Sequence, residues 1–422
     1  VAARYTFRRL FLAGMTALLA VVVGFAVLMI IDIPVIRELA LTASIGVGVL
    51  IFTNLILIPV MLSYIGVTPK AAERSLAVEQ GDSTKATGFG VIWKTLENFT
   101  GRKWAGITIA ASVLLGAWGF VTSLQLQIGD LDAGAPELRA DSRYNQDNAF
   151  VTSNYGISSD VFAVMVKTPD DGCRSYETLT EIDLLDSTLA QVPGVQRTAS
   201  LGETVRSFTS GMFEGNPKWA TVSDNPGLTD PQIGNAVSWN SEFLNANCSI
   251  SPVLAYLSDH KAATLDRVVA AASEFADKHN TPDRQFLLAA GNAGVDAVTN
   301  IVVREANRKM LLYVYAAVAL LCLITFRNWK AVIVALLPLM LTSVLAEALM
   351  VHLGIGVKVA TLPVVALGVG IGVDYAIYLL SVQLAFQRSG LSVADAYRKA
   401  IASTGKVVAL VGVTLAAGVV TW

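Results

Sequence analysis

Long apolar runs separated by polar stretches dominate this chain. A helix needs roughly 20 mostly apolar residues to cross a bilayer. The runs that meet this length are Leu10–Ile31, Leu39–Leu62, Trp104–Leu124, Ala331–Val351 and Val359–Phe386. Leu311–Phe326 is a shorter candidate, and Val407–Trp422 reaches the end of the sequence before it is long enough to cross. The pattern predicts a polytopic α-helical membrane protein.

A long polar and mixed stretch, residues 125–309, separates the third run from the next. It is too long for a connecting loop, so we expect a folded domain. Within it, "SSDVFAVMVKTP" and "GVQRTASLGETV" read as strands on either side of an amphipathic helical pattern. The order recurs in "SPVLAYLSD", "ATLDRVVAAASEFADKH" and "RQFLLAAGN". Two such β-α-β units predict an α+β domain of the ferredoxin-like type.

Two connecting segments of this domain carry further expectations. The stretch 211–247 between the β-α-β units is rich in Asn, Pro and Gly, and we interpret it as irregular. Its "GNPKWATVSDNPGLTD", with Trp219, is either a flexible substrate-facing flap or an insertion packed on its own domain. The helix predicted from about Val295 to Lys309 is expected to continue into the next membrane span.

Positive charge predicts the orientation of the chain. Lys and Arg concentrate in the segments on one side of the predicted membrane: Arg4, Arg8, Arg9, Lys70, Arg74, Lys85, Lys94, Arg102, Lys103, Arg327, Lys330, Arg388, Arg398, Lys399 and Lys406. The short turns on the other side hold Arg37 and Lys358. Because cytoplasmic loops carry the excess of positive charge, the polar domain is expected outside the cytoplasm.

These boundaries divide the chain into five parts. We predict two transmembrane helices in 1–63, a cytoplasmic linker with an amphipathic helix at "WKTLENF" in 64–103, one transmembrane helix in 104–124, the extracytoplasmic domain in 125–309, and further transmembrane helices in 310–422. Only 15% of the 422 residues are charged, against about 25% in soluble proteins. The net charge of −2 offers no basic surface for nucleic acid.

One carboxylate, Asp374, interrupts the apolar segment "LGVGIGVDYAIYLL". An acid near the middle of a membrane costs several kcal/mol if it is charged and unpaired, so it is expected to face the bundle interior and to be neutral part of the time. Such a carboxyl group can carry protons. Tyr375, Tyr378 and Thr414 could donate hydrogen bonds to it. The alternative is that Asp374 only fixes helix packing through a buried hydrogen bond.

Gly368, Gly370 and Gly372 precede this acid at alternate positions. A dinucleotide site needs G-x-G-x-x-G after a strand and at the start of a soluble helix, and neither condition is met here. In a membrane helix, small residues let a neighbouring helix approach closely. The three glycines are therefore predicted to serve helix packing.

The segment "GVGIGVDYAIYLL" resembles the Gly-rich Asp-Tyr helix of resistance-nodulation-division transporters, closest to the mycobacterial-membrane-protein-large (MMPL) exporters. "LQIGDLDAGAPELRADSRYNQD", "TFRNWKAVIVALLPL" and "PVIRELALTASIGVGV" carry the same resemblance. It implies that Asp374 and Tyr375 form one of two proton-relaying Asp-Tyr pairs. It also implies a piece of a longer transporter, from about the fifth of twelve spans into the eleventh.

A short internal repeat agrees with this interpretation. Gly14 and Thr16 align with Gly412 and Thr414 when "RRLFLAGMTALLAVVVGF" is laid over "KVVALVGVTLAAGVVTW". The repeat makes the N-terminal half of the same transporter an expected partner. Membrane lipids, a hydrophobic or lipid-like substrate, and other copies of the chain in a dimer or trimer are the further partners expected. Protons are the expected coupling ion, and no cofactor is expected.

Glu347 is a second intramembrane acid, and two interpretations of it stay open. It takes part in the relay or in a lipid-facing gate, or its carboxyl group reaches the membrane interface. His260, His279 and His352 are too far apart in the sequence to suggest a metal site.

Cys173 and Cys248 both lie in the predicted outside domain, where disulfides persist, whereas Cys322 is alone in a span. A Cys173–Cys248 bridge would staple the irregular stretch to the first β-α-β unit. We expect the end of the first strand and the start of the third to lie at opposite ends of the sheet, so the stretch would have to bring Cys248 back. Two free thiols are the alternative.

The function predicted is proton-driven export of hydrophobic or amphiphilic molecules, with lipids implied by the resemblance, across the inner membrane of a bacterial cell. A protein-export helper and a lipid- or sterol-sensing module of the same fold are the alternatives. An ionisable Asp374 favours transport over sensing. The sequence shows no catalytic triad, phosphate loop or metal spacing that would indicate an enzyme.

Overall fold

The computed structural model describes residues 2–66, 68–69, 99, 101–135, 138–155 and 158–420. The chain forms two compact units. The helical unit comprises residues 1–126, 305–353 and 359–422, and the sheet unit comprises residues 127–304 and 354–358. The predicted amphipathic helix "WKTLENF" lies outside the described residues, apart from its last residue, Phe99.

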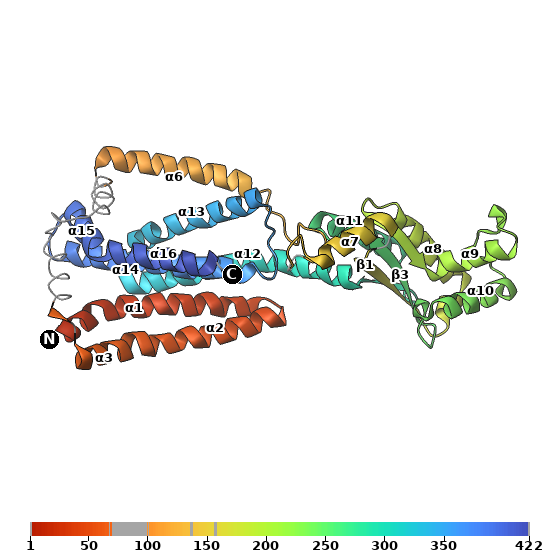
Figure 1. The fold of residues 1–422 in the computed structure, drawn as a ribbon, viewed down its shortest axis with the longest axis horizontal. Coiled ribbons are helices and arrows are strands. Elements are labelled where there is room, and N and C mark those ends of the chain that lie inside the picture. Colours follow the sequence, from red (N-terminus) through yellow and green to blue (C-terminus); the bar gives the residue numbers. More distant parts are fainter. Residues whose placement is uncertain are drawn as a thin grey trace. The chain divides into compact units, whose positions relative to one another are not determined.

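Long helices form the helical unit (Figure 1). They are α1 (Ala2–Val27), α2 (Pro34–Phe52), α3 (Ile58–Ile65), α6 (Arg102–Ser123), the part of α12 (Asn292–Phe326) from residue 305 onward, α13 (Trp329–Leu353), α14 (Leu362–Arg388), α15 (Val393–Ala400) and α16 (Lys406–Val420). Short turns extend three of them: the 3-10 turn Leu28–Ile30 after α1, the π-turn Thr53–Leu57 between α2 and α3, and the π-turn Ile401–Gly405 before α16. Among the described residues, five helical stretches are long and apolar enough to cross a membrane, or six if the bent pair Val393–Gly405 and Val407–Gly418 counts as one.

Local sequence explains where these helices begin and end. Pro34 lies in the first turn of α2, where its fixed φ angle suits a helix and its missing N–H is not needed. Gly66, with φ of 73°, ends α3. The predicted helix at 295–309 does continue into its span: α12 begins at Asn292 and is unbroken to Phe326, which lengthens the short candidate Leu311–Phe326.

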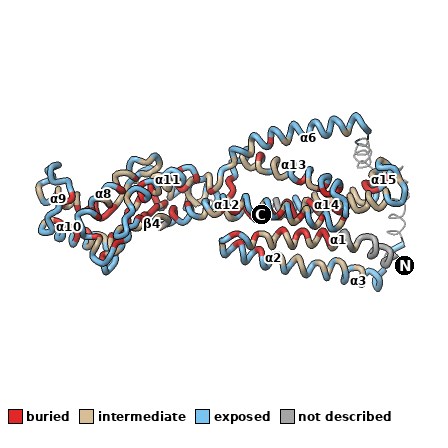
Figure 2. Tube along the Cα trace, turned by 180° about the vertical axis from the view of Figure 1, so that it is seen from behind, coloured by how far each residue is buried: buried red, intermediate tan, exposed pale blue. Residues whose placement is uncertain are grey.

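The helices of this unit differ in how much surface they bury. α1 packs against α2 and α14, and α13 packs against α6 and α14. By contrast, the most apolar windows of Pro34–Ile65 and of α6 are 0% and 6% buried, and Figure 2 shows α2 and α6 largely exposed. Their exposed side chains are apolar, such as Ile45, Val49 and Phe52. Lipid tails are as apolar as these side chains, so such faces are stable in a bilayer.

Two β-α-β units form the centre of the sheet unit. The first is β1 (Val161–Lys167), α8 (Tyr176–Ala190) and β2 (Val195–Ser200), and the second is β3 (Ile250–Leu257), α11 (Ala262–His279) and β4 (Gln285–Ala290). The strands form one antiparallel sheet in the order β2-β3-β1-β4. Its core contains apolar side chains of the strands together with those of α8, α11 and the start of α12.

The second strand is shorter than the sequence pattern predicted. β2 ends at Ser200, and "LGETV" begins α9 (Leu201–Met212) instead of continuing the strand. The Ser200 hydroxyl accepts a hydrogen bond from the Glu203 backbone N–H at 3.1 Å. A Ser followed three residues later by Glu is the capping-box pattern, which starts a helix.

The stretch 211–247 is also more regular than expected, because it contains α10 (Pro226–Trp239). Ile233 and Ala236 of α10 join a second apolar core with Leu179, Leu201 and Val205 of α8 and α9. Trp219 stacks on Phe213, with ring centroids 3.9 Å apart. Of the two interpretations of this stretch, the structure supports an insertion packed on its own domain.

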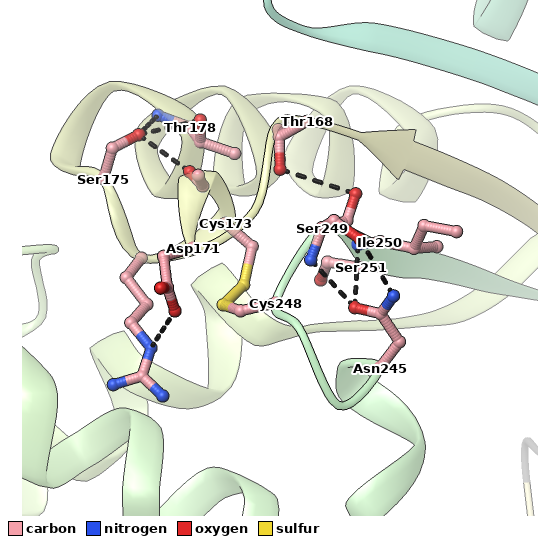
Figure 3. Close-up of a disulfide and its surroundings, with 12 residues drawn as sticks. Thr168, Asp171, Cys173, Ser175, Thr178, Asn245, Cys248, Ser249, Ile250 and Ser251 are labelled. Atoms are coloured by element: carbon pink, nitrogen blue, oxygen red, sulfur yellow. Dashed lines mark hydrogen bonds and ion pairs between the residues drawn. A yellow bond between two sulfur atoms is a disulfide. The ribbon is translucent and has the colours of Figure 1, made fainter.

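Cys173 and Cys248 form a disulfide (Figure 3). Their Cα atoms are 5.3 Å apart, within the usual range. The expectation that these positions lie at opposite ends of the sheet was wrong, because β1 and β3 are antiparallel neighbours and Lys167 pairs with Ile250. Backbone hydrogen bonds extend this pairing to the cysteines, including Cys173 N–H to Cys248 C=O at 3.1 Å.

The segment that enters the sheet unit pairs with the loop between α13 and α14. The Gly129 N–H donates to the Val357 carbonyl and the Val357 N–H to the Gln127 carbonyl, both at 2.9 Å. The Lys358 ammonium lies 2.8 Å from the Asp130 carboxylate. Residues 354–358 of this loop belong to the sheet unit, and α14, which contains Asp374, begins a few residues later in the sequence.

Asp186 is a buried acid of α8 whose side chain faces β2. The Thr198 hydroxyl donates to its carboxylate at 2.9 Å, and its other oxygen has no partner among the described residues. Burial raises the pKa of Asp186 to about 6, against the opposing effect of hydrogen bonds from Thr198 and Ser200. The pKa is raised only in the folded state, so folding is favoured while the Asp186 carboxyl is neutral. This contribution to stability is complete below about pH 4 and is lost as the pH rises through about 6.

We expect Asp186→Asn to flatten the pH dependence of stability. Between pH 4 and 7 the free energy of unfolding of the wild-type protein should fall by up to about 3 kcal/mol through this group, because its pKa is raised by about two units on folding. Thermal unfolding of the whole protein over this range measures the effect. Asp230→Asn, at an exposed position of α10, is the matched control. An unchanged pH profile in Asp186→Asn would contradict the assignment.

Removal of the disulfide by a Cys173→Ser, Cys248→Ser double substitution should destabilise the sheet unit by about 2–5 kcal/mol, because the bridge closes a long loop in the unfolded chain. The sequence separation that it spans is 75 residues. Denaturant unfolding monitored by tryptophan fluorescence checks this. Cys322→Ser, which removes a buried thiol outside the bridge, controls for loss of a cysteine. Equal midpoints for the double variant and the wild type would refute the prediction.

Candidate functional site in the membrane helices

The Asp374 helix, α14, presents a continuous apolar stripe to its neighbours. Its buried residues are Leu362, Ala366, Val369, Gly370, Val373 and Ile377. This three-and-four spacing places them on one face. Asp374 is next to this stripe and four residues after Gly370, so it lies on the side of α14 that packs against α1.

Glycines bring α1 and α14 into close contact. A Cβ atom added at Gly370 would lie 3.5 Å from the Val21 Cα of α1, and one added at Gly24 would lie 3.9 Å from the Gly370 Cα. The two backbones therefore approach with no side chain between them at this point. Gly24 was not singled out from the sequence, because a lone glycine in an apolar run carries no partner information.

The three predicted packing glycines have different surroundings. Gly370 faces α1 as described, and a Cβ atom at Gly372 would lie 2.5 Å from the Leu339 Cδ1 of α13. Gly368 is exposed, with nothing within 4 Å of its added Cβ atom. Gly370 and Gly372 thus contact two different helices, and the described residues supply no neighbour for Gly368.

The Asp374 carboxyl group is partly buried within the helical unit. Its Oδ1 atom is inaccessible to solvent and has no hydrogen-bond partner among the described residues. The Tyr375 hydroxyl has the same two properties. Asp374 also lies within electrostatic range of the buried Cys322 thiol of α12 and of the Tyr378 hydroxyl. The Oδ1 atom is therefore shielded within the helical unit, near Cys322 of α12 and Tyr378 of its own helix.

The two tyrosines contact the glycines that the internal repeat had paired. The Tyr378 hydroxyl lies 3.2 Å from the position of an added Cβ at Gly14 of α1. The Tyr375 hydroxyl lies 3.9 Å from the corresponding position at Gly412 of α16. Each repeat-related glycine thus lies near one tyrosine hydroxyl, and only at Gly14 would an added Cβ atom crowd it.

Contrary to the prediction, Tyr375 makes no hydrogen bond to Asp374 among the described residues, and neither do Thr414 and Glu347. Thr414 is exposed, and its hydroxyl donates to the Leu410 carbonyl of its own helix at 2.8 Å. Glu347 is half-buried on α13, four residues after Ser343, whose hydroxyl is 2.7 Å from the Tyr315 hydroxyl of α12. The sequence did not predict this Tyr315–Ser343 contact, because nothing in α12 identifies its partner on another helix.

The described residues contain no group of three His, Cys, Asp or Glu side chains placed to hold a metal ion. The chemistry that the site itself offers is the gain and loss of a proton at Asp374, with tyrosine hydroxyls as neighbouring donors.

Gly370→Leu should separate α1 from α14 and lower the stability of the helical unit by about 1–3 kcal/mol, because its added atoms have no space between the backbones. Gly368→Leu, two residues earlier and exposed, should be close to neutral. Thermal unfolding of the detergent-solubilised full-length protein compares the two. Equal melting temperatures for the two variants would show that the glycine contact does not hold these helices together.

Comparisons with known proteins identify the family. The family model described as "MMPL family" matches residues 184–421. Among curated proteins none matches the chain significantly. The chain is similar to the cryo-EM structure of the hedgehog release protein Disp from the water bear Hypsibius dujardini, with a TM-score of 0.54, 13% identity, and coverage of 95% of this chain and 53% of that one.

A second similar structure is SecDF, a translocon-associated membrane protein from Thermus thermophilus, with a TM-score of 0.44 and 14% identity. That alignment covers 98% of this chain and 43% of SecDF. The chain thus spans about half the length of these solved structures. Because the family model matches more than half of the chain, this multi-pass membrane protein belongs to the MMPL family.

Proposed function

We propose that this chain is part of a proton-driven exporter of hydrophobic or amphiphilic molecules. Its family suggests lipids as the class of substrate. The observation that carries the proposal is the Asp374 Oδ1 atom, which is buried in the helical unit and has no hydrogen-bond partner in the described part of the chain. A carboxylate in that position is strained by the loss of solvation, whereas a neutral carboxyl is tolerated. The site therefore favours proton uptake and resists permanent charge.

The proton step changes the charge beside the α1–α14 contact. When Asp374 is neutral, α14 can remain packed through Gly370 and Gly24, where the backbones nearly touch. When it loses its proton, the charge must be solvated or paired, which favours a different arrangement of these helices. Repeated protonation from one side and release to the other would drive this change. Tyr375 or Tyr378 would stabilise the charged state by donating a hydrogen bond to Asp374, a bond that the described residues do not form in the present arrangement.

The sheet unit would handle the substrate. Its strand order, β2-β3-β1-β4, and its two β-α-β units support a ferredoxin-like porter domain. The distribution of Lys and Arg supports its placement on the periplasmic side of a bacterial inner membrane. The pairing of Gly129 with Val357 would transmit movement at the start of α14 to this domain. The other half of the transporter and further copies in a dimer or trimer would complete the assembly.

Asp374→Asn should abolish export that depends on a proton gradient, because an amide occupies the same volume but cannot release a proton at neutral pH. Uptake of a fluorescent lipid into inverted vesicles that contain the full-length protein, with and without an imposed pH gradient, measures this export. Asp230→Asn makes the same chemical change at an exposed site and should leave export unchanged. Gradient-dependent export at the wild-type rate in Asp374→Asn would rule out the mechanism.

A further inference from the structure

A second polar cluster lies in the helical unit, away from α14. The Tyr315 hydroxyl of α12 lies 2.7 Å from the Ser343 hydroxyl and 3.4 Å from the Leu339 carbonyl of α13. Glu347 follows Ser343 by four residues, so the two side chains share a face of α13. The Glu347 carboxyl interacts electrostatically with the Tyr315 hydroxyl. Three polar side chains from two helices thus gather at one level.

The hydroxyl pair at the centre of this cluster can pass a proton. In the 2.7 Å contact between Tyr315 and Ser343 either hydroxyl can be the donor. Each hydroxyl has one proton to donate and lone pairs that accept, so a proton received by Ser343 can be followed by the release of another at Tyr315. The Leu339 carbonyl, 3.4 Å from the Tyr315 hydroxyl, only accepts.

The cluster lies between one end of α13 and Asp374. Glu347 lies about 9 Å along the helix from the end of α13 at Leu353. Tyr315 lies two turns of α12, about 10 Å, from Cys322, whose thiol is within electrostatic range of Asp374. Val318 lies between them on the same face and is 1% exposed. The polar cluster and Asp374 are thus separated along α12 by one dry layer.

We propose that Glu347, Ser343 and Tyr315 form the outer part of the route by which protons reach Asp374. Glu347 takes a proton from external water and passes it to the Ser343 hydroxyl as that group releases its own to Tyr315. A water molecule admitted past Val318 receives the proton from Tyr315 and delivers it to the Asp374 carboxylate. Glu347, now ionised, is reprotonated from outside, so one proton is transferred and no group is consumed.

The route assigns Glu347 a role different from that of a side chain reaching the interface. A carboxyl group that only reached the headgroups would have no use for a hydrogen-bonded hydroxyl pair one turn deeper. A Tyr315–Ser343 bond that only held α12 to α13 would not need the adjacent acid. The inference rests on the proposed function and on the orientation that places the end of α13 outside.

Infrared difference spectroscopy of the full-length protein in liposomes tests the route without a transported substrate. The external pH is dropped rapidly, and the C=O band of newly protonated carboxyl groups is followed in time. The part of this band that is lost in Asp374→Asn belongs to Asp374. In Glu347→Gln and in Tyr315→Phe this component should appear about tenfold more slowly than in the wild type, because a proton-transferring group is missing.

Two variants control for structural effects. Thr342→Val changes an exposed hydroxyl on the same helix that donates to the Pro338 carbonyl, and it should leave the rate unchanged. Glu347→Asp keeps the acid and should be closer to the wild type than Glu347→Gln. Wild-type rates in both Glu347→Gln and Tyr315→Phe would overturn the route while leaving the proposed function standing. If the wild-type band contains no Asp374 component, the proposed function fails together with the route.

Discussion

The contact between α1 and α14 is the constraint on which the rest of the helical unit depends. Two glycines, Gly24 and Gly370, allow the backbones to meet without intervening side chains. Association of helices in a bilayer gains nothing from the hydrophobic effect, so close packing of this kind is what holds them. Asp374 follows Gly370 by four residues and so lies on the same side of α14, where a charged carboxylate exposed to lipid tails would cost several kcal/mol.

The apolar pattern predicted the helices better than it predicted the domain between them. Runs such as Ala331–Val351 are long and uniform, so composition alone identifies them, and α13 differs only at its ends. The strands of the sheet unit were also found, because β1 and β3 are apolar and bounded by turn residues. The failure at β2 had a local cause: Ser200 and Glu203 start a helix where the apolar alternation still suggested a strand.

Contacts between segments distant in the sequence could not be predicted in the same way. The Cys173–Cys248 pair was proposed for its compartment, but its geometry was misjudged, because antiparallel pairing of β1 with β3 is a property of the assembled sheet. Asp374 stood out because an acid is rare in an apolar run. Tyr315 and Ser343 did not, because single hydroxyl groups are common in membrane helices and only their 2.7 Å approach distinguishes them.

The arrangement around Asp374 connects the repeat in the sequence to the chemistry of the site. Gly14 and Gly412 aligned only as part of a weak internal match, yet each lies beside a tyrosine hydroxyl of α14. A side chain at Gly14 would crowd the Tyr378 hydroxyl, whereas a Cβ atom at Gly412 would be in ordinary van der Waals contact with the Tyr375 hydroxyl. Tyr378 and Tyr375 then contact α1 and α16, respectively. A change in the charge of Asp374 would therefore affect the surroundings of both α1 and α16. A proton-driven movement of helices requires such an effect on more than one helix.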